Sequence, residues 1–131
     1  MVKKHIIGLA GTIGIVRNEI LDILKELLME ARFKNTSPMV YQKDNLRIGV
    51  ATKGNYGGEI FHSIRYFESS DCQIIITPCL TWGNTHWAIV SAQDFTYEFI
   101  YIYRWEIKYK SKIKYAKQIL EKIYEFQSKL S

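Results

Sequence analysis

The chain alternates short apolar runs with longer segments in which apolar residues recur every third or fourth position. Short, nearly continuous apolar runs are typical of buried strands, and they occupy residues 3–9, 46–52 and 72–78. We expect helices at residues 16–33, 59–69 and 86–92. The order strand, helix, strand, helix, strand, helix favours a mainly parallel sheet with right-handed crossovers and helices on its faces.

Between the first helix and the second apolar run, the pattern is weaker. Residues 34–38 (KNTSP) form a cluster of helix-breaking residues, and residues 39–41 are expected to form a short extended piece before a turn at residues 43–45. We therefore expect about five strands in the sheet.

A stripe of large apolar residues follows the third helix. It consists of Phe95, Tyr97, Phe99, Tyr101, Tyr103, Trp105, Ile107 and Tyr109, which occupy alternate positions. A strand would place all of them on one face, and at some 13 to 15 residues it would be long enough to bend or to extend past the sheet. The amphipathic helix expected at residues 111–130 is the natural cover for this face.

Length and composition fit one domain spanning residues 1–131, because 47% hydrophobic residues suffice for a core without disulfides. The expected fold class is α/β, a three-layer sandwich. No apolar stretch approaches the roughly 20 residues that cross a bilayer, so we expect no membrane partner. Cys72 and Cys79 are too far apart along one strand to bridge, and reduced thiols fit the cytoplasmic location that we expect.

The net charge of +5 is unevenly distributed. Residues 104–129 hold eight basic and three acidic residues, whereas the rest of the chain is balanced. A basic helix beside an aromatic strand raises the alternative of a nucleic-acid surface, because bases stack on aromatic rings and phosphates attract lysine. So many aromatic side chains on one strand also predict self-association into a homo-oligomer.

Three segments rich in glycine, threonine or asparagine follow the predicted parallel strands, at residues 8–17, 53–58 and 77–85. Ligands of such sheets bind beyond the carboxyl ends of the strands, so we expect the three segments to share one site. The candidate ligand-binding residues are Gly11, Thr12, Gly14, Arg17, Asn18, Lys53, Asn55, Thr81, Asn84 and His86.

The first of these segments, HIIGLAGTIG followed by an acidic and then apolar helix, resembles the N-terminus of small P-loop kinases, notably the nucleoside monophosphate kinases of phages and bacteria. The resemblance covers about the first 30 residues and implies a P-loop-kinase-like fold. It also implies phosphate contacts for the matching residues, which are Gly11, Gly14, Arg17 and Asn18. A plain glycine-rich turn that lets the helix pack close to its strand is the alternative.

The Walker A pattern is degenerate in this chain. Val16 stands where the second glycine belongs, Arg17 replaces the lysine, and Asn18 replaces the hydroxyl that holds magnesium. The strands at residues 46–52 and 72–78 do not end in an acid that would help to hold the metal.

We therefore expect a non-catalytic or weakly catalytic binding protein for a nucleotide or other phosphorylated small molecule. The alternatives are an active nucleotide kinase or NTPase with an atypical loop, and an oligomeric interaction or nucleic-acid-binding module. The histidines and cysteines show no metal-ligand spacing, and no catalytic residue or cofactor is identified. A nucleophilic Cys79 beside His86 fits no sequence signature.

Overall fold

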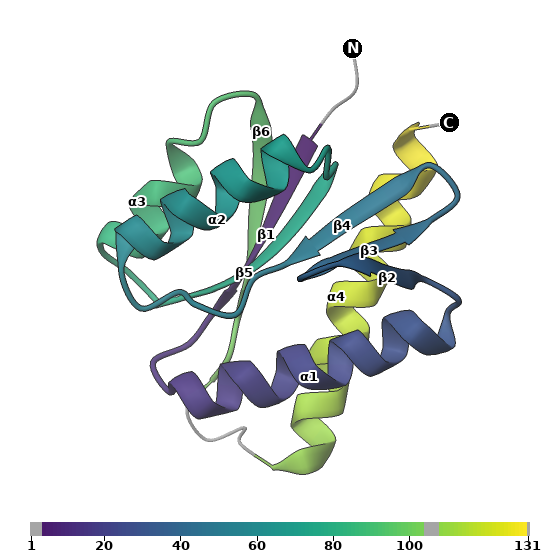
Figure 1. Cartoon of the computed structure of the whole chain (residues 1–131). Helices are drawn as coiled ribbons and strands as arrows, with labels where there is room; N and C mark the ends of the chain where they lie inside the picture. The colour runs from purple at the N-terminus through teal and green to yellow at the C-terminus, as the bar shows by residue number, and fades with distance from the viewer. Residues whose placement is uncertain (1–3, 104–107, 131) are drawn as a thin grey trace.

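The computed structural model describes residues 4–103 and 108–130, which form one six-stranded sheet flanked by helices (Figure 1). The strands are β1 (Lys4–Ala10), β2 (Lys34–Ser37), β3 (Val40–Lys43), β4 (Leu46–Val50), β5 (Ile74–Cys79) and β6 (Phe95–Tyr101). The helices are α1 (Gly14–Glu30), α2 (Gly57–Ser69), α3 (Asn84–Val90) and α4 (Tyr109–Leu130). In this part of the chain, no helix combines the length and the apolar character needed to cross a membrane.

The sheet is mainly parallel, in the order β2-β3-β4-β5-β1-β6. Strands β4, β5, β1 and β6 run parallel, whereas β3 pairs antiparallel with β4, and β2 pairs antiparallel with β3. The prediction of an α/β fold with a mainly parallel sheet is confirmed.

The expected number of about five strands is wrong, because the segment taken as a helix-breaking cluster forms the edge strand β2. Its residues are largely exposed, so no buried apolar pattern marks it as a strand. The side-chain amide of Asn35 donates hydrogen bonds to the carbonyls of Ser37 and Val40, and Met39 has a φ of 63° in the turn. Polar side chains and the turn thus replace hydrophobic patterning here.

The helices lie in two layers, one on each face of the sheet (Figure 1). On one face, α1 and α4 pack together over a core that includes Ile7, Ile48 and Ile76. On the other face, α2 and α3 pack together over a core that includes Ile6 and Ile75. Neighbouring isoleucines of one strand thus point to opposite layers, as the alternation of a doubly covered sheet requires.

The aromatic stripe is shorter than expected, and α4 does not cover it. Strand β6 ends at Tyr101, Tyr109 belongs to α4, and the predicted stripe positions at 105 and 107 lie outside the described residues. Ile100, on the other side of β6, is the residue that joins the α4 core.

The aromatic side chains of β6 instead face α3. Phe99 stacks on His86 with ring centroids 4.0 Å apart and an interplanar angle of 10°. Helix α3 has only seven residues, so Tyr97 and Tyr101 remain 45% exposed. The basic helix α4 and the aromatic stripe therefore lie on opposite faces of the sheet.

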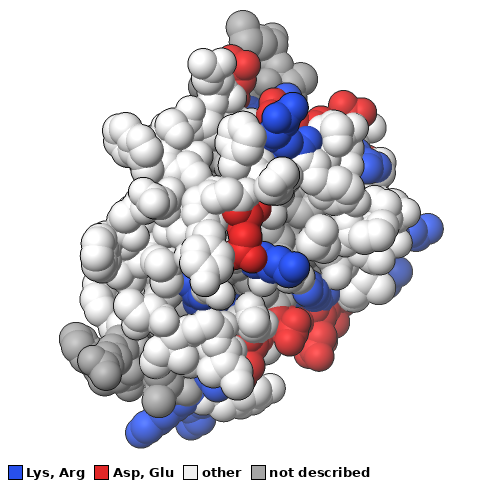
Figure 2. Space-filling model, turned by 60° about the vertical axis from the view of Figure 1, so that its left-hand side comes forward, with Lys and Arg blue, Asp and Glu red and all other residues white. Residues whose placement is uncertain are grey.

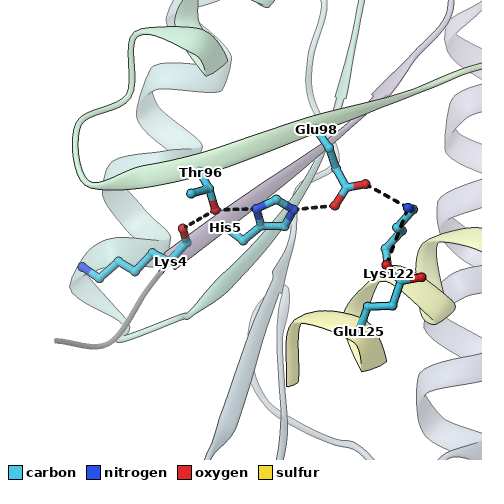
Figure 3. Close-up of polar contacts among 6 residues, drawn as sticks. All are labelled: Lys4, His5, Thr96, Glu98, Lys122 and Glu125. Carbon is cyan, nitrogen blue, oxygen red and sulfur yellow. Dashed lines mark hydrogen bonds and ion pairs between the residues drawn. The ribbon is translucent and has the colours of Figure 1, made fainter. Parts of the chain in front are cut away.

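A polar cluster at the amino end of the sheet ties α4 to β1 and β6 (Figure 3). The ring of His5 bonds to Thr96 Oγ1 through Nδ1 at 2.7 Å and to Glu98 Oε2 through Nε2 at 2.6 Å. Lys122 of α4 lies 3.5 Å from the other oxygen of Glu98 and 3.6 Å from Glu125. Glu98, and to a lesser degree Glu125, raise the pKa of Lys122. The cluster fixes one end of α4 by charge as well as by packing.

Candidate functional site

The turns that follow β1, β4 and β5 lie at the same edge of the sheet, because these strands are parallel neighbours. A cleft of about 880 Å³ opens there between the first turns of α2 and α3. All three turns contribute to its walls, which include Thr12, Asn55 and Thr81. The expectation that the three glycine- and asparagine-rich segments share one edge of the sheet is confirmed.

Four exposed aromatic side chains dominate the lining of this cleft. They are Tyr56, Phe61, Trp82 and Trp87, which are 72%, 54%, 78% and 70% exposed. None of the described residues that line the cleft is charged. Figure 2 shows this side of the molecule as a broad area with few charged side chains. Clustered aromatic rings that find no place in a core are typical of a binding surface.

Arg17 lies beneath the cleft and joins all three turns. Its side chain comes from the first turns of α1 and is only 3% exposed. Nη1 donates hydrogen bonds to the carbonyl of Gly11 at 2.9 Å and to that of Cys79 at 2.8 Å, and Nη2 donates to Oδ1 of Asn55. Burial lowers the pKa of Arg17, while Cys79 and Glu59 act in the opposite direction. The guanidinium is therefore used inside the protein and does not face the cleft.

The start of α1 is uncapped. Ile13 holds the N-cap position and makes no side-chain cap bond, and no acidic residue lies in the first turn. The first amides of a helix have no partner within it, so those of residues 14–16 are available to an acceptor. Thr12, just before this turn, lines the cleft, whereas Asn18 is exposed on the helix and does not.

The start of α2 differs, because it already holds a negative charge. Glu59 accepts hydrogen bonds from the backbone amides of Asn55 and Tyr56 at 3.1 and 3.3 Å. A carboxylate at this position offsets the positive end of the helix dipole, so a second anion is disfavoured there. Lys53 is exposed and is not part of the cleft lining.

The turn after β4 is held against β5 by a glycine contact. A Cβ added at Gly54 would lie 1.7 Å from the carbonyl oxygen of Pro78, so no other residue fits without displacing the backbone. This close approach brings Asn55 next to the end of β5 and within reach of Arg17.

Thr81 and Asn84, on the third segment, line the cleft, and His86, just after it, does not. His86 points toward β6, where it stacks on Phe99 and lies 5.9 Å from the ring of Tyr101. Its Nε2 is buried without a hydrogen-bond partner in the described part of the chain, and burial lowers the pKa of its ring. The structure thus places His86 in packing contact with β6 and outside the cleft wall.

In total, the structure brings four of the ten candidates into the cleft wall: Thr12, Asn55, Thr81 and Asn84. Sequence reasoning missed the four aromatic residues. Two of them, Tyr56 and Trp82, lie among glycine and polar residues, where an aromatic side chain has no core to join. The other two, Phe61 and Trp87, lie off the buried faces of their helices. Both features could have been recognised from the sequence.

The described residues form no metal-ligand group, and both thiols are buried. Within residues 4–103 and 108–130, no group of three His, Cys, Asp or Glu side chains is arranged to hold a metal ion. Burial raises the pKa of Cys72 to about 11 and that of Cys79 to about 12. Because the thiolate is the reactive form, neither cysteine is activated as a nucleophile near neutral pH.

No protein-family model, curated protein or solved structure matches the chain.

Proposed function

We propose that the protein binds a nucleotide or a related phosphorylated small molecule at the carboxyl edge of its sheet, and that it acts by binding rather than by catalysis. The observation that carries the proposal is the cleft itself, in which four exposed aromatic rings lie beside the β1–α1 turn. Its volume of about 880 Å³ falls within the range of small-molecule sites, about 300–1,000 Å³.

The two parts of a nucleotide match two parts of this edge. A base has a flat π-face, and stacking on an aromatic side chain contributes about 1–3 kcal/mol per base. Thr12 connects the cleft to the uncapped start of α1, where free backbone amides favour a phosphate group. The base would therefore lie among the aromatic rings, with the phosphate toward residues 14–16.

Binding is favoured over turnover because the cleft wall lacks reactive groups. Its described residues include no carboxylate, amine, thiol or imidazole. Phosphoryl transfer depends on positive groups and metal-holding acids around the phosphates, and Arg17 is committed to internal carbonyls. The likeness to P-loop kinases remains part of this proposal, supported by the parallel sheet and the turn after β1.

Tryptophan fluorescence provides the test, since Trp82 and Trp87 both line the cleft. We expect at least one mono- or triphosphate of adenosine, guanosine, cytidine or uridine to change the tryptophan emission, and this change should saturate as the nucleotide concentration rises. Loss of one stacking ring in Trp87→Ala should weaken the best binder by about tenfold or more. Tyr124→Ala removes an exposed aromatic ring from α4 and is the matched control.

Two results would overturn the proposal. One is a flat titration with every nucleotide at millimolar concentration. The other is steady magnesium-dependent hydrolysis or phosphoryl transfer by the unaltered protein, which would favour the active-kinase alternative. Arg17→Ala is unsuitable for this decision, because the side chain holds the turns together and its loss perturbs the whole edge.

A second proposal, self-association, rests on β6. This strand is at the edge of the sheet, and Tyr97, Tyr101 and Tyr103 remain 45%, 45% and 55% exposed. Sedimentation velocity should show a dimer that dissociates in Tyr97→Lys, and a monomer at all concentrations would contradict it. The nucleic-acid alternative is less favoured, because the aromatic stripe and the helix α4 that carries the lysines pack on opposite faces of the sheet.

A further inference from the structure

Asn55 is a polar residue of the cleft that two hydrogen bonds hold in place. Its backbone amide donates to Glu59 Oε1 at 3.1 Å, and its side-chain oxygen accepts from Nη2 of Arg17. A guanidinium has five donors and no acceptor, so the amide atom that faces it must be the oxygen. The NH₂ group of Asn55 is consequently turned away from Arg17.

That NH₂ group is left for a ligand. In the part of the chain that the structure describes, Nδ2 of Asn55 makes no hydrogen bond, and Asn55 lines the cleft. Arg17 is itself held by the carbonyls of Gly11 and Cys79, so it keeps Asn55 in this one orientation. A fixed donor among aromatic rings selects for a flat ring with an acceptor on its edge.

We infer that Arg17 is a positioning residue, which orients Asn55 so that its Nδ2 donates a hydrogen bond to an uncharged planar ring bound in the cleft. The acceptor on the edge of that ring is a keto oxygen or a pyridine-type nitrogen. The inference rests on the proposed function, since it names the chemistry that the same cleft recognises. It assigns the base rather than the phosphate as the part of the ligand that Asn55 contacts. The uncharged wall of the cleft agrees with a neutral ring.

Asn55→Asp removes the Nδ2 donor that faces the cleft but keeps an oxygen that accepts from Arg17. The new carboxylate still accepts from Arg17, with added charge, and this gain offsets its repulsion from the nearby Glu59, so the turns stay joined and the unfolding temperature should change little. The donor toward the cleft is lost. Neutral probes avoid any repulsion between the new charge and a phosphate.

The probes are 7-azaindole and indole, two rings of the same size, of which only 7-azaindole carries a pyridine-type nitrogen. Each is titrated into the protein, and binding is followed by the NMR chemical shifts of the protein. The unaltered protein should bind 7-azaindole about threefold to tenfold more tightly than indole, as one neutral hydrogen bond allows. Asn55→Asp should lose this preference, while Trp87→Ala should weaken both rings. In the unaltered protein, the side-chain NH₂ signals of Asn55, identified by their absence in Asn55→Asp, should shift with 7-azaindole.

The failures of the two proposals are distinguishable. If both rings bind in a manner that depends on Trp87, but neither the preference nor the NH₂ signals change as described, the role of Asn55 is wrong and the proposed function survives. If neither ring nor any nucleoside binds, the cleft is not a ring site, and both proposals fall. If Asn55→Asp lowers the unfolding temperature clearly even when Glu59→Gln has removed the neighbouring carboxylate, Arg17 does not anchor Asn55 as described, and the inference is overturned.

Discussion

Replacing Arg17 by alanine should destabilise the protein strongly, because the side chain is buried and joins three turns. The change removes three hydrogen bonds from a charged donor, two to the backbone carbonyls of Gly11 and Cys79 and one to Asn55. Hydrogen bonds that involve a charged group contribute about 1.5–3 kcal/mol each. A simple sum overstates the loss, because burial of the guanidinium itself costs free energy, as its lowered pKa indicates.

We therefore expect Arg17→Ala to lower the free energy of unfolding by about 3–5 kcal/mol, comparable to breaking a buried ion pair. Arg17→Lys should lie between this variant and the unaltered protein, because an ammonium keeps the charge but lacks the planar fork that reaches several acceptors. Urea unfolding followed by circular dichroism measures all three. Lys53→Ala, which removes an exposed cation from the second turn, is the matched control and should change the free energy by less than about 0.5 kcal/mol.

A residue that serves only to hold a phosphate would behave in the opposite way. Its loss would leave the unfolding free energy almost unchanged, or raise it, and would weaken ligand binding alone. An Arg17→Ala protein within about 0.5 kcal/mol of the unaltered protein would therefore refute the structural role assigned to Arg17.

Three further predictions concern residues outside the cleft. His86→Phe keeps a ring for stacking and removes a buried unpartnered nitrogen, so urea unfolding at neutral pH should show a gain of about 1 kcal/mol. Because the folded state binds a proton on His86 less readily than the unfolded state, the free energy of unfolding should fall as the pH drops below about 6.5. This fall should be smaller in His86→Phe. The same pH profile in both proteins would contradict this prediction. Cys72 and Cys79 should react with a thiol reagent only after denaturation, and rapid labelling of the native protein would contradict this. The free energy of unfolding should also decrease as the pH rises above about 9, because the thiols then ionise in the unfolded state but not in the folded state, where their pKa values are about 11 and 12. Glu98→Gln weakens the contacts with His5 and Lys122 and should lower the free energy of unfolding by about 1 kcal/mol, a modest amount because Glu98 is 32% exposed. Glu125→Gln should lower it by less. Equal effects of the two variants in urea unfolding would argue against the cluster of Figure 3.

The parallel core of the fold was predictable because its strands carry an unambiguous pattern. A strand covered on both faces must be apolar at nearly every position, and in CQIIITP only Gln73 and Thr77 are polar. Strand β2 was not predictable in this way, since an exposed edge strand such as KNTS needs no apolar residues. Its pairing depends on the turn at Met39 and on the side chain of Asn35.

The alternation of aromatic residues also could not show on which face of the sheet the aromatic stripe lies. Period-two spacing shows that Phe95, Tyr97, Phe99 and Tyr101 share a face, but both faces of the sheet carry helices. Which helix covers them depends on the crossovers of the whole chain. Ile100, between Phe99 and Tyr101, and Ile102, just after Tyr101, lie on the side that packs toward α4.

The candidate site was predictable in position but not in chemistry. Parallel strands bring their carboxyl ends to one edge, so the glycine-rich turns had to meet there. Arg17 lies three and seven residues before Ile20 and Leu24, on the buried side of α1, but this spacing does not show which groups its guanidinium contacts. The resemblance to a phosphate-binding loop made Arg17 a candidate for a ligand contact, whereas the structure uses it to hold Asn55.

The most direct test of the proposed site is a backbone and side-chain NMR titration of the protein with AMP, GMP, CMP and UMP. The proposal predicts that at least one of them shifts signals of Thr12, Asn55 and the indoles of Trp82 and Trp87, with smaller changes at the start of α1 and none along α4. Signals that stay in place with all four nucleotides, or that move only on α4 and β6, would contradict the assignment of this cleft as the binding site.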